Sequence, residues 1–181
     1  MASRWRHLST STEQPDMQPP GVLFVCLGNI CRSPSAQGVL EQQLRQRDWR
    51  SQLRVDSCGT ADFHNGRPPD PRAVAAAERK GYDISAQRAR QIEPVDYQRY
   101  QYLLAMDRMN LLNLQSWAPR DFNGEIALLM NYDKRRGATQ VDDPYYGGAE
   151  QFDRMFTTLE RVIPQLLAYL DERHGLSRSK T

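Results

Sequence analysis

One short stretch near the start of the chain constrains the fold more than any other part. The residues from Gly21 to Cys26 form a near-continuous apolar run, which is typical of a β-strand buried on both faces. The run ends at Cys26, and the spacing Cys26-x5-Arg32 then leads directly into Ser33 and a helical pattern. A loop that joins a strand to a helix N-terminus points backbone N–H groups inward and can bind an anion. The sequence therefore predicts a phosphate-binding loop with a thiol at its base.

The rest of the chain alternates between strand-like and helix-like segments. Ser33 is a candidate N-cap for the first helix, and Pro34 then takes the first helical position, where its missing N–H is harmless. Such alternation predicts a three-layer α/β sandwich, in which helices cover both faces of a four-stranded parallel sheet. The expected strands are 21–26, 53–57, 100–106 and 125–130. The expected helices are 33–47, 71–80 with Gly81 as its stop, one capped by Asp107, and 148–170, an amphipathic helix that contains Pro164.

Length and composition bound the class of protein. A chain of 181 residues suits one domain, which we place at 21–172, between a flexible N-terminal tail at 1–20 and a C-terminal tail at 173–181. The formal net charge of +2 does not indicate the strongly basic surface of a nucleic-acid-binding protein. No apolar stretch approaches the roughly 20 residues of a membrane span. The N-terminus lacks the apolar region of a secretion signal, and three cysteines are an odd, sparse count typical of a reducing compartment. We therefore expect a cytoplasmic monomer or weak dimer without nucleic-acid or membrane partners.

Cys26 is the expected nucleophile. The loop N–H groups and Arg32 favour its thiolate, and a thiolate at the base of a phosphate cup suits attack on phosphorus. The alternative, a buried structural cysteine, fits the loop context poorly. Arg32 carries a planar fork that can bind two phosphate oxygens at once, whereas its alternative is an ordinary surface ion pair. Gly28 and Asn29 tolerate the positive φ angles that a tightly curled loop requires.

Carboxylates elsewhere in the chain are candidates for a general acid, which a poor leaving group needs. Asp142 and Asp143 are adjacent in a segment with turn residues on both sides. From the residues alone, either of them is a candidate. Asp107, at the end of the third expected strand, either caps the next helix or hydrogen-bonds the backbone of the loop.

Two stretches of the sequence resemble a known family. The run Cys-Leu-Gly-Asn-Ile-Cys-Arg-Ser-Pro at 26–34 and the sequence Asp-Pro-Tyr-Tyr at 143–146 are similar to motifs of the low-molecular-weight protein tyrosine phosphatases, and the resemblance spans roughly 21 to 170. It implies the flavodoxin-like phosphotyrosine phosphatase I fold. It also implies metal-independent hydrolysis of phosphotyrosine and small aryl phosphates, without a cofactor and with a phosphotyrosine-containing protein as partner. The implied roles are a cysteinyl-phosphate on Cys26, phosphate binding by Arg32, and general acid and base catalysis by Asp143, which directly precedes the proline.

The resemblance also implies a slot for the aromatic ring of the substrate. Tyr145 and Tyr146 are expected at its mouth, and Leu27 and Ile30 along its walls, where a flat ring can stack. The alternative for the two tyrosines is a pair of exposed loop residues. Relatives that act on phosphoarginine carry threonine at the position of Ile30, so this branched apolar side chain favours phosphotyrosine.

Three further residues have two interpretations each. Ser33 is an N-cap, a hydroxyl donor to the Cys26 thiolate, or both. Cys31 is either a small packing residue or a redox partner that forms a reversible disulfide with Cys26 and protects it from irreversible oxidation. Ser57, after the second expected strand, either is a plain strand-end residue or braces the loop through Asn29.

Two other classes of function are alternatives. An arsenate reductase would use the same fold, but it needs further cysteines to relay a disulfide, and no cysteine follows Cys58. A module that only binds phosphorylated partners would not need a general acid. A metal site is not expected, because His7, His64 and His174 do not have the spacing of metal ligands.

Overall fold

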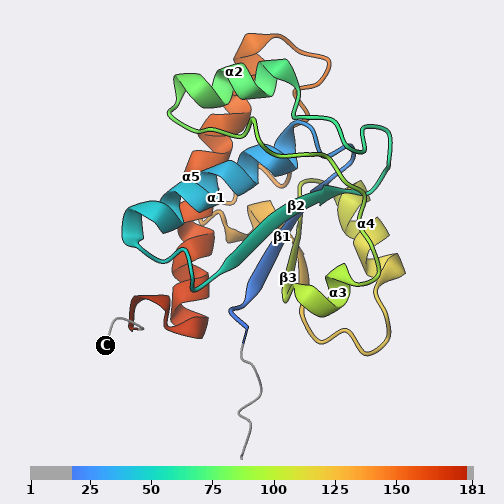
Figure 1. The fold of residues 1–181 in the computed structure, drawn as a ribbon, viewed down its shortest axis with the longest axis vertical. Helices are drawn as coiled ribbons and strands as arrows, with labels where there is room; N and C mark the ends of the chain where they lie inside the picture. Colours follow the sequence, from blue (N-terminus) through green and yellow to red (C-terminus); the bar gives the residue numbers. More distant parts are fainter. Residues whose placement is uncertain (1–17, 179–181) are drawn as a thin grey trace, which may run out of the picture.

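The computed structural model describes residues 18–178 and contains a four-stranded parallel sheet (Figure 1). The strands, in the order β2-β1-β3-β4, are β1 (Gly21–Cys26), β2 (Arg54–Gly59), β3 (Tyr102–Ala105) and β4 (Glu125–Leu128). The register pairs Cys26 with Gly59 and Val25 with Ala105. The carboxyl ends of all four strands therefore meet at one edge, which confirms the predicted sheet. Cys26 lies in the middle of this edge, where ligands bind in open α/β sheets.

Helices cover both faces of the sheet, as the alternation of segments predicted. One side carries α1 (Arg32–Arg47), α2 (Pro71–Arg79) and α5 (Ala149–His174), and the other carries α3 (Asp96–Arg99) and α4 (Arg108–Trp117) (Figure 1). Val22 and Phe24 of β1 pack into the core on the side of α1 and α5. Leu23 and Val25 point the opposite way and pack with Leu114 of α4. Because β1 is buried from both sides, its residues form a continuous apolar run.

The start of α1 differs from the prediction. The helix begins at Arg32, its N-cap is Cys31, and no side chain caps it. The expectation that Ser33 is the N-cap is therefore wrong, and Pro34 occupies the third helical position rather than the first. A proline is tolerated there because the first four N–H groups of a helix have no partner within it. The Ser33 hydroxyl is consequently available to the preceding loop.

The other elements follow the prediction with shifts at their ends. Asp107 caps α4 as expected, since its carboxylate accepts a hydrogen bond of 2.8 Å from the N–H of Asn110. Gly81 follows the end of α2 with a φ of 84°, which suits a glycine after a helix. β4 ends earlier than expected, because the chain turns into the 3₁₀ helix η1 (Leu129–Tyr132). β2 starts and ends later than expected, and it reaches Gly59.

The long helix α5 buries the apolar stripe that predicted it, and Pro164 lies inside the helix. α5 continues past residue 172, where a tail was expected to begin, and Leu176 in the 3₁₀ turn η2 (Leu176–Arg178) is buried in the same core. The N-terminal tail expected at 1–20 lies outside the described residues, apart from 18–20. No helix between residues 18 and 178 is long and apolar enough to cross a membrane. The buried residues of the stripe are Phe152, Met155, Phe156, Leu159, Val162, Ile163, Leu166, Leu167 and Leu170.

Candidate active site

The loop between β1 and α1 is anchored to the end of β2. The N–H of Thr60 donates to the carbonyl of Cys26 at 2.9 Å, and the N–H of Ala61 donates to the carbonyl of Leu27 at 3.0 Å. A Cβ at Gly59 would lie 2.6 Å from the carbonyl oxygen of Leu27, so only glycine allows this approach. Asn29 adopts a φ of 56°, which its residue type tolerates. The loop is thus curled against the neighbouring strand.

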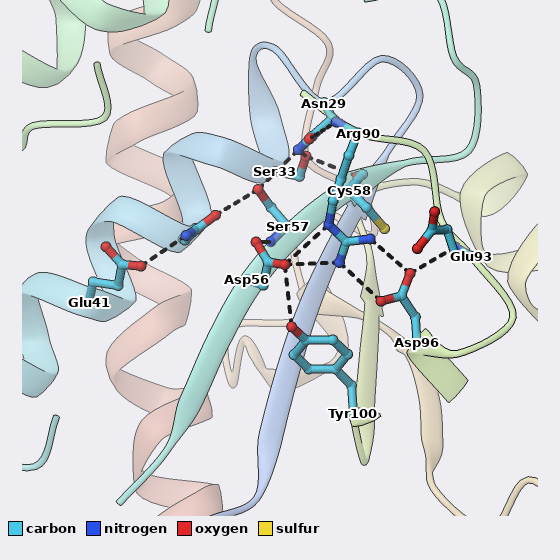
Figure 2. Close-up of polar contacts among 11 residues, drawn as sticks. Asn29, Ser33, Glu41, Asp56, Ser57, Cys58, Arg90, Glu93, Asp96 and Tyr100 are labelled. Carbon is cyan, nitrogen blue, oxygen red and sulfur yellow. Dashed lines mark hydrogen bonds and ion pairs between the residues drawn. The ribbon is translucent and has the colours of Figure 1, made fainter. Parts of the chain in front are cut away.

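The sulfur of Cys26 lies at the base of this loop and has two polar neighbours. The N–H of Asn29 donates to Sγ at 3.2 Å, and the hydroxyl oxygen of Ser33 lies 3.0 Å from Sγ. The Asn29 amide nitrogen donates to Ser33 Oγ at 2.9 Å and to Ser57 Oγ at 3.0 Å, so the expected contact between Asn29 and Ser57 is present (Figure 2). The geometry therefore allows Ser33 to stabilise negative charge on the sulfur.

Arg32 reaches the same site from the first turn of α1. Its side chain is only 4% exposed, so it is not the surface ion pair that was the alternative for this residue. One guanidinium nitrogen, Nη1, donates to Asp107 Oδ2 at 2.7 Å and to the carbonyl of Val141 at 3.4 Å. Burial alone would lower the pKa of Arg32, but Cys26, Asp107 and Asp143 outweigh it and raise the pKa, so the guanidinium is charged. Asp107 was expected either to cap the next helix or to hydrogen-bond the loop backbone. Besides capping α4, its carboxylate binds the Arg32 side chain and not the loop backbone, so the second expectation is corrected.

The structure distinguishes between the two candidate carboxylates. Asp143 lines the cavity above Cys26, and its Oδ2 lies 3.5 Å from Nη2 of Arg32. Asp142 does not line that cavity and borders a separate hollow beside α5. The other oxygen of Asp143, Oδ1, accepts the N–H of Tyr145 at 3.2 Å, which fixes the carboxylate within its turn. Asp143 is therefore the one of these two carboxylates that shares a cavity with Cys26 and contacts Arg32.

A cavity of about 320 Å³ opens above the sulfur. Of the residues predicted for the site, Asn29 and Ser33 do not line it and instead support the loop from behind. Tyr146 lies at the mouth and is 95% exposed, while Tyr145 is partly covered and meets it edge to face at 5.0 Å. The predicted residues that do line the cavity are Cys26, Leu27, Gly28, Ile30, Cys31, Arg32, Asp143, Tyr145 and Tyr146.

Two lining residues, Phe63 and His64, were missed by the sequence analysis. Phe63 is 70% exposed at the rim, and the His64 ring packs against the loop at Gly28, where an added Cβ would meet it at 2.9 Å. Their place in the sequence could have indicated that they lie near the site. Both residues lie in the turn-rich segment that follows β2, and the carboxyl end of β2 meets the same edge of the sheet as Cys26.

Arg72, also missed, connects the two loops that form the site. Its Nη1 donates to the carbonyls of Tyr145 at 2.9 Å and Gly147 at 3.2 Å. Its Nη2 pairs with Asp70 at 2.8 Å, and this hydrogen bond lowers the pKa of the Asp70 carboxyl. The N–H of Asp70 in turn donates to the carbonyl of Ile30 at 2.8 Å. The loop that carries Asp143 is thereby tied to the phosphate loop.

Cys31, the expected redox partner, is a buried free thiol on the same loop. Burial is the first cause that raises the pKa of this thiol, and the charge of Asp70 raises it further. Cys31 is therefore neutral near neutral pH, which leaves Cys26 as the better candidate nucleophile of the two. Cys58, for which no function was expected, is also buried, and burial raises its pKa as well.

Comparison with known proteins adds to this geometry. Residues 21–176 match the family model described as low molecular weight phosphotyrosine protein phosphatase. The human low molecular weight phosphotyrosine protein phosphatase is 37% identical over 155 residues, which cover 84% of this chain and 95% of the human protein. A crystal structure of a protein tyrosine phosphatase from Entamoeba histolytica matches with a TM-score of 0.81 at 31% identity, and the match covers 85% of this chain and 98% of that one. The Drosophila arginine phosphatase matches with a TM-score of 0.78 at 29% identity and covers 82% and 96% of the two chains.

Proposed function

The chain belongs to the low molecular weight phosphotyrosine protein phosphatase family, and from that membership we propose a mechanism in which Cys26 forms a cysteinyl-phosphate with phosphotyrosine. One observation carries the proposal. The Cys26 sulfur, the buried Arg32 guanidinium and the Asp143 carboxylate come from two distant segments and border one cavity. A nucleophile, an anion-binding fork and a proton donor are the three groups that the hydrolysis of a phosphate monoester requires.

In the first step, the Cys26 thiolate attacks phosphorus and the bond to the tyrosyl oxygen breaks. Asp143, protonated at this stage, gives its proton to that oxygen, so a neutral phenol leaves rather than a phenolate. Arg32 binds two of the non-bridging oxygens with its fork, and Asp107 holds the fork in place at 2.7 Å. The products are the cysteinyl-phosphate and a dephosphorylated tyrosine.

In the second step, water replaces the sulfur on phosphorus. The Asp143 carboxylate takes a proton from the water, the new P–O bond forms, and the S–P bond breaks. Cys26 leaves as a thiolate, which the Ser33 hydroxyl at 3.0 Å and the Asn29 N–H at 3.2 Å stabilise by hydrogen bonding. Inorganic phosphate is released, and Asp143 is protonated for the next cycle.

The cavity walls support an aromatic substrate. Leu27 and Ile30 line the cavity, and Tyr145 and Tyr146 stand at its mouth, as expected of a slot for an aryl ring. Ile30 offers no hydroxyl and little room to a guanidinium, which favours phosphotyrosine over the phosphoarginine class of substrate. The Drosophila arginine phosphatase shares this fold, so phosphoarginine is a necessary comparison in any assay.

The two other function classes have less support. All three cysteines of the chain precede residue 60. An arsenate reductase needs later cysteines to pass a disulfide along, and this sequence has none. A module that only binds phosphate has no use for Asp143 above the nucleophile. The sparse cysteines also support the proposal of a cytoplasmic enzyme, which we expect to act as a monomer or weak dimer on a phosphotyrosine-containing protein.

Phosphate release is the direct test of the function. We expect the wild-type protein, freshly reduced and with EDTA present, to release phosphate from p-nitrophenyl phosphate and from a phosphotyrosine peptide. A phosphoarginine peptide should be a much poorer substrate. Preferred hydrolysis of phosphoarginine would contradict the phosphotyrosine assignment. Tight peptide binding without release would favour a binding module, and thiol-dependent reduction of arsenate would favour the reductase.

The redox role proposed for Cys31 has a separate test. Cys31→Ser is expected to keep most of the wild-type activity but to recover less activity after peroxide and then reductant, because no Cys26–Cys31 disulfide can intercept the sulfenic acid. Phosphate release before and after the treatment measures both quantities. The same experiment on Cys58→Ser provides the control, since Cys58 lies outside the cavity. Equal recovery in Cys31→Ser and the wild type would rule the role out.

A further inference from the structure

Arg90 lies behind the phosphate loop and hydrogen-bonds to it through its backbone N–H. The Arg90 N–H donates to Asn29 Oδ1 at 3.0 Å, and the Arg90 carbonyl accepts the N–H of Gly59 at 2.8 Å. The backbone of Arg90 thus joins the end of β2 to the Asn29 side chain, and Figure 2 shows its contact with Asn29. Arg90 does not line the cavity, so it has no direct contact with a bound substrate.

Two carboxylates hold the Arg90 side chain from opposite sides. Asp56 accepts from Nη2 at 2.9 Å and from Nε at 3.2 Å, and Asp96 accepts from Nη1 at 2.9 Å and from Nη2 at 3.1 Å (Figure 2). Asp96 is only 1% exposed and also accepts the N–H of Glu93 at 2.8 Å. The Tyr100 hydroxyl donates to Asp56 at 3.3 Å. Four hydrogen bonds from its guanidinium to these two carboxylates therefore fix the position of Arg90.

The direction of the hydrogen bonds leads from Arg90 to the nucleophile. Because Arg90 donates to the amide oxygen of Asn29, the amide nitrogen must face the two serines, and it donates to Oγ of both Ser33 and Ser57. Ser33 then accepts rather than donates in its contact with Asn29. Its own hydroxyl hydrogen is left for the Cys26 sulfur at 3.0 Å, with the Cys58 carbonyl at 3.3 Å as the longer alternative. The Ser57 hydroxyl donates a hydrogen bond to Gln37 Oε1 at 2.7 Å.

We propose that Arg90 is a positioning residue for the nucleophile, held by Asp56 and Asp96 so that its N–H keeps Asn29 in the orientation that directs the Ser33 hydroxyl to Cys26. This inference rests on the proposed function, since it assigns a role within that reaction. When Asp56 and Asp96 no longer hold Arg90 in place, the Asn29 amide can turn or move. Ser33 then donates to Cys26 for a smaller fraction of the time, and the departing thiolate of the second step loses a hydrogen bond.

The test separates this role from general stabilisation. We expect Arg90→Gln to lower kcat for p-nitrophenyl phosphate about tenfold, which is the effect of losing one charge-assisted hydrogen bond, with less than about a threefold change in KM. The pH midpoint of Cys26 alkylation by iodoacetamide should rise by about one unit. Arg79→Gln is the matched control: it removes an exposed ion pair of 2.8 Å with Asp153 and should leave both quantities unchanged.

A double-mutant cycle with Ser33→Ala shows whether the effect passes through that hydroxyl. In the Ser33→Ala background, Arg90→Gln should cost less than about twofold in kcat, because the contact that it disturbs is already absent. A further tenfold loss, as independent sites would give, would overturn the proposal. An unchanged alkylation midpoint in Arg90→Gln would overturn it as well.

Arg90→Gln leaves the buried Asp96 without its cation, so a second variant guards against loss of folding. Asp56→Asn keeps the Arg90–Asp96 pair and removes only the half-exposed carboxylate. Asp56→Asn should lower kcat and raise the pH midpoint of alkylation, as Arg90→Gln does but by a smaller amount. Arg90→Lys should retain part of the kcat that Arg90→Gln loses. Wild-type values in Asp56→Asn would contradict the role. Alkylation needs no substrate, so these results stand apart from whether phosphotyrosine is the right substrate.

Discussion

Cys26→Ser is expected to abolish phosphate release, with a loss of at least about 10⁴-fold in kcat. A serine hydroxyl is not ionised near neutral pH, and the two groups that contact the Cys26 sulfur, the Ser33 hydroxyl and the Asn29 N–H, are hydrogen-bond donors rather than bases. Ser33 donates a hydrogen to this position, and Asp143 must begin the cycle protonated. The residual hydroxyl therefore cannot attack phosphorus at a useful rate.

The variant should still bind the substrate, because Arg32 and the loop N–H groups are unaffected. Calorimetric titration of a phosphotyrosine peptide into Cys26→Ser measures this binding, and phosphate release with EDTA present measures the activity. Cys58→Ser, which removes the buried thiol outside the cavity, is the matched control and should retain activity. Turnover by Cys26→Ser within a hundredfold of the wild type would exclude the cysteinyl-phosphate mechanism.

Asp143→Ala is expected to lower kcat on a phosphotyrosine peptide by about 10² to 10⁴-fold, the usual contribution of a general acid. The tyrosyl oxygen is a poor leaving group without a proton. p-Nitrophenol leaves far more readily as an anion, so the loss on p-nitrophenyl phosphate should be clearly smaller. The descending limb of the pH–rate profile on the basic side should also flatten, because no proton donor remains to be lost.

Asp142→Ala is the matched control for this prediction, since the two carboxylates are adjacent and only Asp143 lines the cavity. It should keep nearly the wild-type kcat on both substrates. Asp143 also lies 3.5 Å from Arg32, so the comparison uses kcat rather than kcat/KM, which an altered phosphate site would change as well. An equal loss on both substrates, or a larger loss in Asp142→Ala, would remove Asp143 from the role of acid.

Most of the architecture could be predicted because local patterns report burial. The apolar run at Gly21–Cys26 and the stripe along 148–170 have the periods of a two-sided strand and a one-sided helix, and both elements are present. The ends of elements were less predictable. β4 stops at Leu128 because the chain turns there, and no residue pattern near Met130 marks that turn.

Ser33 shows where local rules give the wrong answer. A serine followed by a proline is a good N-cap by sequence, but in the fold its hydroxyl is shared between Asn29 and Cys26. A polar side chain forms a hydrogen bond with whichever partner the tertiary structure brings within about 3 Å. That partner need not be a neighbour in the sequence. The helix therefore begins one residue earlier and without a side-chain cap.

The sequence by itself determined the parts of the site that lie on one short segment: Cys26, Arg32 and the curled loop between them, together with the parallel sheet that carries the loop. Only the tertiary structure decided which distant groups meet that loop. It brought Asp143, which the family resemblance had selected over Asp142, to the same cavity as Cys26, and it brought Phe63 and His64 to the rim. It also set Asp107 against Arg32 from the end of β3, and Arg90 against Asn29 from the segment between α2 and α3. The physical reason is that backbone conformation and burial follow from nearby residues. Contacts between segments that are far apart in sequence depend on sheet register and on the paths of the connecting loops, which no local pattern encodes.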